Sequence, residues 1–330
     1  MGKKYRNLIG RIADRDNLIH AYENAARGKR RSLGYLMFKE HLGANLSGLQ
    51  AEILNGSYAP GEYRRFMVYE PKLREVAALP FYDRVAQHAL CNIIEPIFDA
   101  GFVPQSYACR RGKGTHAGAI AVQAMMRRMM AAGPVFVLKT DFSKYFASID
   151  RAILHREIRR KISCRATLRM IEAITPSAGT GLPIGNLTSQ LYANVFGSLF
   201  DRWLIARGHT RFVRYMDDVV VLAHAKESLQ MLRMGLAWFA EANGMRFSHW
   251  SIAPAGSGVN FLGYRIFPKH KLLRRRSVVS AKRKLARLDG ERRERFLSAW
   301  LGHAAHADTR NLLTKMGVAP CITSTRKQAR

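Results

Sequence analysis

Three aspartates in this chain have the residue type and the sequence setting for metal-dependent phosphoryl transfer. Asp217 and Asp218 lie between two short apolar runs. These runs, 211–215 and 219–223, predict a β-hairpin with both acids at its tip. Asp141 ends a third apolar run, whose β-branched and aromatic residues favour a buried strand. Carboxylates are the hard ligands that Mg²⁺ prefers, and two such ions stabilise the attacking and leaving oxygens of phosphoryl transfer. Paired acids are also common in turns for turn geometry alone, so the hairpin by itself does not establish a metal site.

The strands and helices predicted around these acids indicate an α+β fold. Two further strands are expected at 246–252 and 259–267, and the last sixty or so residues are expected to be basic and helical. Ser148 or Asp150 can cap one helix, and Pro96 is expected to bend or end another. Apolar residues at helical spacing predict helices at 80–98, 115–132, 151–162, 188–206 and 226–242.

The charge balance indicates a polyanionic partner. The chain carries 54 basic and 24 acidic residues, a formal net charge of +30. A compact fold with this excess repels itself unless an acidic partner compensates, and nucleic acid is the usual one because phosphate contacts release counterions. A generic basic protein, such as a ribosomal component, would also explain the charge, which carries no information about catalysis.

Cysteine usage and the N-terminus predict a cytoplasmic protein. Cys91, Cys109, Cys164 and Cys321 are widely spaced and form no CxxC pair, which argues against a disulfide framework and a structural zinc site. The charged N-terminus lacks an apolar signal core, and no apolar stretch approaches the ~18 residues that span a membrane. We therefore expect a cytoplasmic protein that does not associate with a membrane.

The segments around the aspartates resemble reverse transcriptases, in the usual order of that family, over about residues 65–267. Tyr215-Met216-Asp217-Asp218 is similar to the family's catalytic hairpin, and 140–146 is similar to its first palm motif. The segment 71–74 resembles the part of the fingers that grips the incoming triphosphate, and 261–264 resembles the primer-grip strand. Two more segments, 81–90 and 106–112, are typical of bacterial and group II intron enzymes.

The resemblance implies a right-hand polymerase fold and a set of site residues. It assigns 1–135 to an N-terminal extension and fingers, 136–267 to a palm in which 165–185 returns toward the fingers, and 268–330 to a short helical thumb. Asp141, Asp217 and Asp218 would be catalytic and would bind two Mg²⁺ ions together with Phe142, with Mn²⁺ as a substitute. The nucleotide-binding residues would be Lys72, Arg74, Phe146 (matching the gate that excludes a ribose 2′-hydroxyl), Ile184, Gly185 and Gln190. The residues expected to contact nucleic acid are Arg110, Arg111, Tyr215, Met216, Phe261, Leu262, Gly263, Tyr264, Lys271, Arg274, Arg275, Arg276, Lys282 and Arg283.

One departure from the family pattern points to a particular branch. Most relatives have a Gln where this chain has Ile184, and a Pro where it has Gln190. The resulting signature resembles the reverse transcriptases of diversity-generating retroelements, which phages and bacteria encode. These enzymes copy a template RNA into adenine-mutagenised cDNA from dNTPs, form an RNA/cDNA hybrid, and carry out mutagenic retrohoming with an oligomeric accessory variability protein. Ile184 cannot make the hydrogen bond that a Gln could make in the nucleotide pocket, and a missing contact of ~1–3 kcal/mol corresponds to about one or two decades of discrimination. The simpler interpretation is that Ile184 packs against the palm.

Two alternatives remain open at the level of the sequence. A retron or group II intron-type reverse transcriptase with an unusual pocket would share the same aspartates. A catalytically inactive RNA-binding scaffold descended from a polymerase would share the charge, although the intact acid set argues against it.

Overall fold

The computed structural model describes residues 3–69 and 73–318, which divide into two compact units. The first unit comprises residues up to 109 together with 142–208 and 237–247. The second unit comprises 110–141, 209–236 and the chain from 248 onward. Each unit is described by itself below. Lys72, expected to bind nucleotide, and Cys321 lie outside the described residues.

The first unit is built on helix α5, Phe81–Asp99. Its buried residues recur at helical spacing, and the predicted Pro96 lies inside the helix, which continues to Asp99. Pro96 removes one backbone donor but does not end the helix, which continues for three more residues. Helices that pack against α5 are α1 (Ile9–Ile12), α2 (Arg15–Ala26), α3 (Leu33–Glu40), α4 (Leu42–Asn55) and α10 (Leu187–Ala206).

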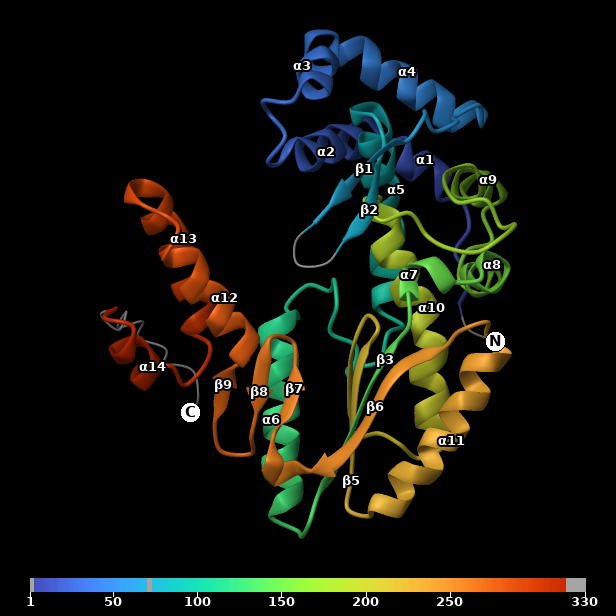
Figure 1. The fold of residues 1–330 in the computed structure, drawn as a ribbon. Coiled ribbons are helices and arrows are strands. Elements are labelled where there is room, and N and C mark those ends of the chain that lie inside the picture. Colours follow the sequence, from blue (N-terminus) through green and yellow to red (C-terminus); the bar gives the residue numbers. More distant parts are fainter. Residues whose placement is uncertain (1–2, 70–72, 319–330) are drawn as a thin grey trace. The chain divides into compact units, whose positions relative to one another are not determined.

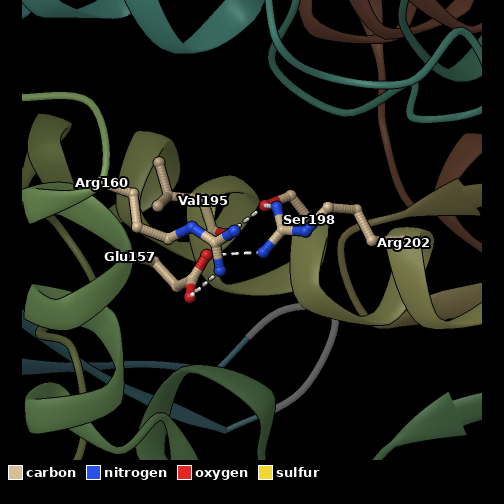
Figure 2. Close-up of polar contacts among 5 residues, drawn as sticks. All are labelled: Glu157, Arg160, Val195, Ser198 and Arg202. Atoms are coloured by element: carbon tan, nitrogen blue, oxygen red, sulfur yellow. Dashed lines mark hydrogen bonds and ion pairs between the residues drawn. The ribbon is translucent and has the colours of Figure 1, made fainter. Parts of the chain in front are cut away.

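Helix α8 (Arg151–Arg159) is fastened to α10 by a buried carboxylate. Glu157 is 5% exposed and lies 2.5 Å from the guanidinium of Arg202 on α10 and 3.4 Å from that of Arg160 (Figure 2). Asp150 accepts a hydrogen bond from the backbone N–H of Ile153, which confirms the predicted cap of this helix. The same part of the unit contains α7 (Tyr145–Ser148) and α9 (Arg165–Ile174).

The strands β1 (Arg64–Val68) and β2 (Arg74–Ala78) form an antiparallel hairpin, shown in Figure 1, that was not predicted from the sequence. Every residue of β1 is exposed, so the strand has no apolar alternation by which to recognise it. The hairpin is attached to the turn before α10, because the Ala77 N–H donates to the carbonyl of Ile184 at 2.7 Å.

The second unit contains a four-stranded sheet in the order β4-β5-β3-β6. Its strands are β3 (Phe136–Phe142), β4 (Phe212–Tyr215), β5 (Asp218–Ala223) and β6 (Phe247–Pro254). Helix α6 (Thr115–Met130) packs against β4, and its N-cap residue is Gly114. Helix α11 (Lys226–Ala242) contributes residues to both units.

A second, three-stranded sheet follows β6 in the chain and leads into the C-terminal helices. The strand expected at 259–267 is divided into β7 (Val259–Phe261) and β8 (Tyr264–Ile266), which pair antiparallel across a turn at Leu262 and Gly263. A third strand, β9 (Lys271–Leu273), lies in the segment that was expected to be entirely helical. The remaining elements are η1 (Ala255–Ser257), α12 (Arg275–Leu285), α13 (Gly290–Ala304) and α14 (Arg310–Lys315).

Three histidines and a tyrosine connect α6, β8 and α13 within the second unit. The Tyr264 hydroxyl lies 2.7 Å from Nδ1 of His116 and 3.2 Å from Nδ1 of His303. The rings of His116 and His306 stack with their centroids 3.7 Å apart. Burial, reinforced by the neighbouring histidines, lowers the pKa of His116 and of His303, so both rings favour the neutral form.

No helix among the described residues is both long enough and apolar enough to cross a membrane.

The buried carboxylate of Glu157, drawn in Figure 2, leads to a prediction about the free energy of unfolding. Glu157→Gln should lower the free energy of unfolding by about 2 kcal/mol, because it removes a charge-assisted bond in a buried position. Arg160→Gln is the matched control, and it should cost about 0.5 kcal/mol or less because the Arg160 side chain is 64% exposed. Denaturant unfolding measures both, and equal losses in the two variants would contradict this account.

Candidate active site

The register between β3 and β5 places two of the three predicted acids opposite each other. Asp141 near the end of β3 and Asp218 at the start of β5 are antiparallel partners. Directly opposed residues project from the same face of a sheet with Cβ atoms about 5 Å apart. Asp217 lies in the two-residue turn that joins β4 to β5. The predicted hairpin with acids at its tip is therefore confirmed, and the third acid comes from the neighbouring strand.

The turn that carries Asp217 is held in an uncommon backbone conformation. Met216 has a φ of +52°, which a side chain with a Cβ rarely adopts and which costs ~1–3 kcal/mol. Arg214 is fully buried beneath the turn, and its guanidinium donates to the carbonyl of Met216 at 3.3 Å. Strain of this kind is common at functional sites, where the surrounding structure fixes a conformation that the chain would not otherwise choose.

Two side chains that the sequence did not single out contact the acids. The Ser248 hydroxyl on β6 donates to Oδ2 of Asp141 at 2.7 Å. The Lys139 ammonium on β3 lies 2.8 Å from Oδ1 of Asp218. Burial raises the pKa of Asp218, the Lys139 charge opposes that rise, and the nearby Asp217 reinforces it. The alternation of β3 could have revealed Lys139, because it lies two residues before Asp141 and so projects from the same face.

The donor chemistry of this site fits a divalent cation. Within 3–69 and 73–318 no three His, Cys, Asp or Glu side chains are already grouped as a complete metal site. Asp141 and Asp218 nevertheless supply hard oxygen ligands at opposed positions of the sheet. Oδ1 of Asp218 is buried, and the group that contacts it is already a cation, the Lys139 ammonium. The side chain of Phe142 is 2% exposed and stacks on Tyr145 and Phe247, so the atom of Phe142 that could bind a metal ion is its backbone carbonyl oxygen.

The predicted nucleotide-binding residues that the structure describes belong to the first unit. The carbonyl of Phe146 accepts a hydrogen bond from the N–H of Leu182, and this bond joins the first palm motif to the turn before α10. Ile184 is 38% exposed on that turn, so its side chain is not packed into the core. Arg74 is an exposed residue of β2.

Gly185 is required where it stands because the backbone of β2 approaches it closely. Its φ is +125°, and a Cβ there would lie 2.5 Å from the carbonyl oxygen of Ala77. The two residues that follow Gly185 are held by long-range hydrogen bonds. The Asn186 amide donates to the Tyr63 hydroxyl, and Gln87 on α5 accepts from the N–H of Leu187 at the start of α10. Further along α10, the exposed Gln190 accepts a hydrogen bond from the thiol of Cys109.

An open basic cavity of about 470 Å³ lies in the second unit beside the acids. Lys139 and the predicted nucleic-acid residues Arg274, Arg275 and Arg276 line it, and so does Arg265, which was not predicted. The other polar residues of its wall are His249, Ser251 and Asn260.

The remaining residues expected to contact nucleic acid differ in how exposed they are. Lys282 and Arg283 on α12 and Arg111 are exposed, and Arg110, Tyr215, Leu262 and Gly263 are half-buried. Phe261, Tyr264 and Met216 are buried. Lys271 is 6% exposed with its ammonium over the ring of Tyr264, and burial lowers its pKa, so the structure does not place it among the exposed basic residues.

Comparison with known proteins agrees with the geometry of the acids. Residues 69–266 match the family model of the reverse transcriptase (RNA-dependent DNA polymerase). Protein YkfC of Escherichia coli (strain K12) is 24% identical over 313 residues, covering 80% of this chain and 80% of that protein. The nuclear intron maturase 2, mitochondrial, of Arabidopsis thaliana is 25% identical over 150 residues, covering 40% of this chain and 20% of that protein.

Two further proteins are also similar to this chain. The putative COX1/OXI3 intron 1 protein of Saccharomyces cerevisiae is 24% identical over 172 residues, covering 48% of this chain and 20% of that protein. A solved telomerase of Candida albicans in complex with a fragment of telomeric RNA has a TM-score of 0.49 at 8% identity, covering 80% of this chain and 57% of that chain.

The family model covers more than half of the chain, and the chain therefore belongs to the reverse transcriptases, the family of RNA-dependent DNA polymerases. The aspartates at positions 141, 217 and 218 lie within the matched residues. The α+β fold that the sequence predicts is confirmed.

Burial of Asp218 predicts a pH-dependent effect on stability. Because its pKa is raised in the folded protein, the folded state binds this proton more tightly than the unfolded chain does, so stability falls as the pH rises from the ordinary aspartate value through the raised one. At pH values above that window, the full free-energy cost of burying the charged carboxylate is present, and Asp218→Asn should raise the melting temperature there. The gain should shrink as the pH falls through the window.

The control for this prediction is Asp289→Asn, at an exposed position that makes no capping hydrogen bond. Melting curves from pH 4 to pH 8 measure both variants. An Asp218→Asn variant that is less stable than the unsubstituted protein at pH 8 would show that the Lys139 ion pair outweighs the cost of burial.

Proposed function

We propose that this protein synthesises DNA on an RNA template at Asp141, Asp217 and Asp218. The observation that carries the proposal is the antiparallel register that opposes Asp141 and Asp218, with Asp217 in the adjoining turn. Membership of the reverse transcriptase family supports the reaction class, and the opposed carboxylates support the position of its chemistry.

The chain's own residues would bind and orient the reacting groups. Two divalent ions, Mg²⁺ or Mn²⁺, would supply stabilisation of the attacking and leaving oxygens when they are bound by the three aspartates. Ser248 holds one oxygen of Asp141, which fixes the direction in which that carboxylate points. The strained turn at Met216 fixes the other two acids, so little reorganisation is needed before reaction.

Other residues would select the dNTP and hold the template RNA with its cDNA. Phe146 would exclude a ribose 2′-hydroxyl, and Arg74 with Lys72 would bind triphosphate oxygens. The arginine-lined cavity supports contact with the phosphates of the RNA/cDNA hybrid, because contacts of this kind position a duplex without reading its sequence. The net charge of +30 supports a larger RNA partner than one short duplex.

We infer that the enzyme is the error-prone type found in diversity-generating retroelements. Ile184 carries this inference, because it replaces a hydrogen-bonding residue and is 38% exposed on the turn that β2 contacts. An exposed isoleucine there gives the pocket no polar contact with which to reject a poorly placed nucleotide. Gln190 completes the signature, and an oligomeric accessory variability protein is the partner that this type would require.

A second candidate is an intron-type or retron reverse transcriptase. The names of two relatives, an intron-encoded protein and an intron maturase, favour it. It differs from the first candidate in one measurable property: its errors would not be concentrated opposite template adenines.

Primer extension tests the polymerase proposal. Asp217→Asn should reduce divalent-ion-dependent cDNA synthesis on an RNA template by at least about 10²-fold, because it removes a carboxylate on which charge stabilisation depends. Asp150→Asn is the matched control, since an asparagine also caps a helix, and it should retain activity. Equal synthesis by the two variants would refute the assignment of the acids.

Sequencing of the cDNA tests the role of Ile184. Ile184→Gln should lower misincorporation opposite template adenine by about tenfold, because it restores a polar contact in the pocket. Ile184→Val keeps the apolar character and should leave the error rate high. The exposure of this side chain gives a glutamine room to be accommodated. An error rate that is the same in all three proteins would favour the intron-type candidate.

A further inference from the structure

The Lys139 ammonium can reach two environments, one that attracts its positive charge and one that repels it. Its ammonium lies 2.8 Å from Oδ1 of Asp218, one of the proposed metal ligands. The same side chain lines the basic cavity with Arg265, Arg274 and Arg275. One side of Lys139 is therefore acidic, and the other side is strongly basic.

The ammonium and a divalent cation compete for the same carboxylate oxygen. A metal ion bound at Oδ1 of Asp218 would be repelled by a positive charge 2.8 Å from that oxygen, so the ammonium must move away when the ion binds. Asp218 is a residue of limited exposure, at 22% for its side chain, so water screens this repulsion only in part.

The cavity is an unfavourable place for the Lys139 ammonium as long as no anion is bound there. The wall of the cavity carries four arginines, at positions 265 and 274–276. Arg274 is close enough to Asp218 to lower the pKa of that carboxyl. Moving another cation toward these arginines costs free energy unless an anion compensates, and a nucleic-acid phosphate in the cavity would do so.

We propose that Lys139 is a positioning residue that couples divalent-ion binding at Asp218 to nucleic-acid binding in the cavity. Without nucleic acid, Lys139 remains on Asp218 and weakens divalent-ion binding. With phosphate in the cavity, the ammonium pairs with phosphate and releases Oδ1 of Asp218. Coupling of this kind is reciprocal, so a bound ion also strengthens nucleic-acid binding. The proposal rests on the proposed function of the aspartates as metal ligands.

Mn²⁺ titration followed by electron paramagnetic resonance of the free ion tests this coupling in the 330-residue chain. The probes are Mn²⁺ alone and Mn²⁺ with an RNA-template/DNA-primer duplex, and a duplex-only titration is subtracted. In the unsubstituted protein the duplex should tighten Mn²⁺ binding by about fivefold or more. Lys139→Met should bind Mn²⁺ about fivefold more tightly than the unsubstituted protein when no duplex is present, and the duplex should then have little further effect.

Three matched variants keep the outcomes distinct. Lys139→Arg retains the cation and should restore the coupling, whereas Lys226→Met, at an exposed position on α11, should behave as the unsubstituted protein does. Asp218→Asn should lose Mn²⁺ binding, and if it does not, the proposed metal site itself is wrong. If Asp218→Asn loses binding but Lys139→Met binds Mn²⁺ as weakly as the unsubstituted protein, or more weakly, only the role of Lys139 is refuted.

Discussion

The antiparallel register of β3 and β5 is the constraint on which the proposed chemistry depends. It opposes Asp141 to Asp218 and Lys139 to Val220. A shift of one residue would turn the acid of one strand to the opposite face of the sheet, and no rotamer could bring the carboxylates back together. Val219 to Leu222 are buried on both faces of β5, so a shifted register would also require the core to repack on both sides of the sheet.

In the first unit, the close approach of the β2 backbone holds the turn before α10 in place. The turn before α10 contacts β2 through the bond from Ala77 to Ile184, and only a glycine fits at position 185. Gln87 on α5 accepts from the first N–H group of α10, one of the backbone donors at a helix start that have no partner within the helix. The exposure of Ile184 is therefore a consequence of how its turn is held, so a substitution at 184 should leave the core unchanged.

The sequence was sufficient for the acid hairpin, the cap at Asp150 and the main helices, because each has a local signal in periodicity or in capping chemistry. It was insufficient where a strand has no buried face, as in β1, whose residues are all exposed. It also did not reveal the break at Leu262, whose φ of +49° is uncommon for leucine, although the following glycine was a hint. The contact of Ser248 depends on pairing between strands that are distant in sequence, so no local pattern could show it. The alternation of β3 places Lys139 on the face of Asp141, but its ion pair with Asp218 also depends on the pairing of β3 with β5.

The most direct test of the central claim is the position of a bound cation. Crystals of the protein soaked in Mn²⁺ give an anomalous difference map in which the anomalous scattering of Mn²⁺ distinguishes the ion from water and lighter ions. The account predicts a peak within coordination distance of the carboxylates of both Asp141 and Asp218, as their opposed positions on β3 and β5 require. A well-occupied Mn²⁺ peak elsewhere, with none at these carboxylates, would contradict it.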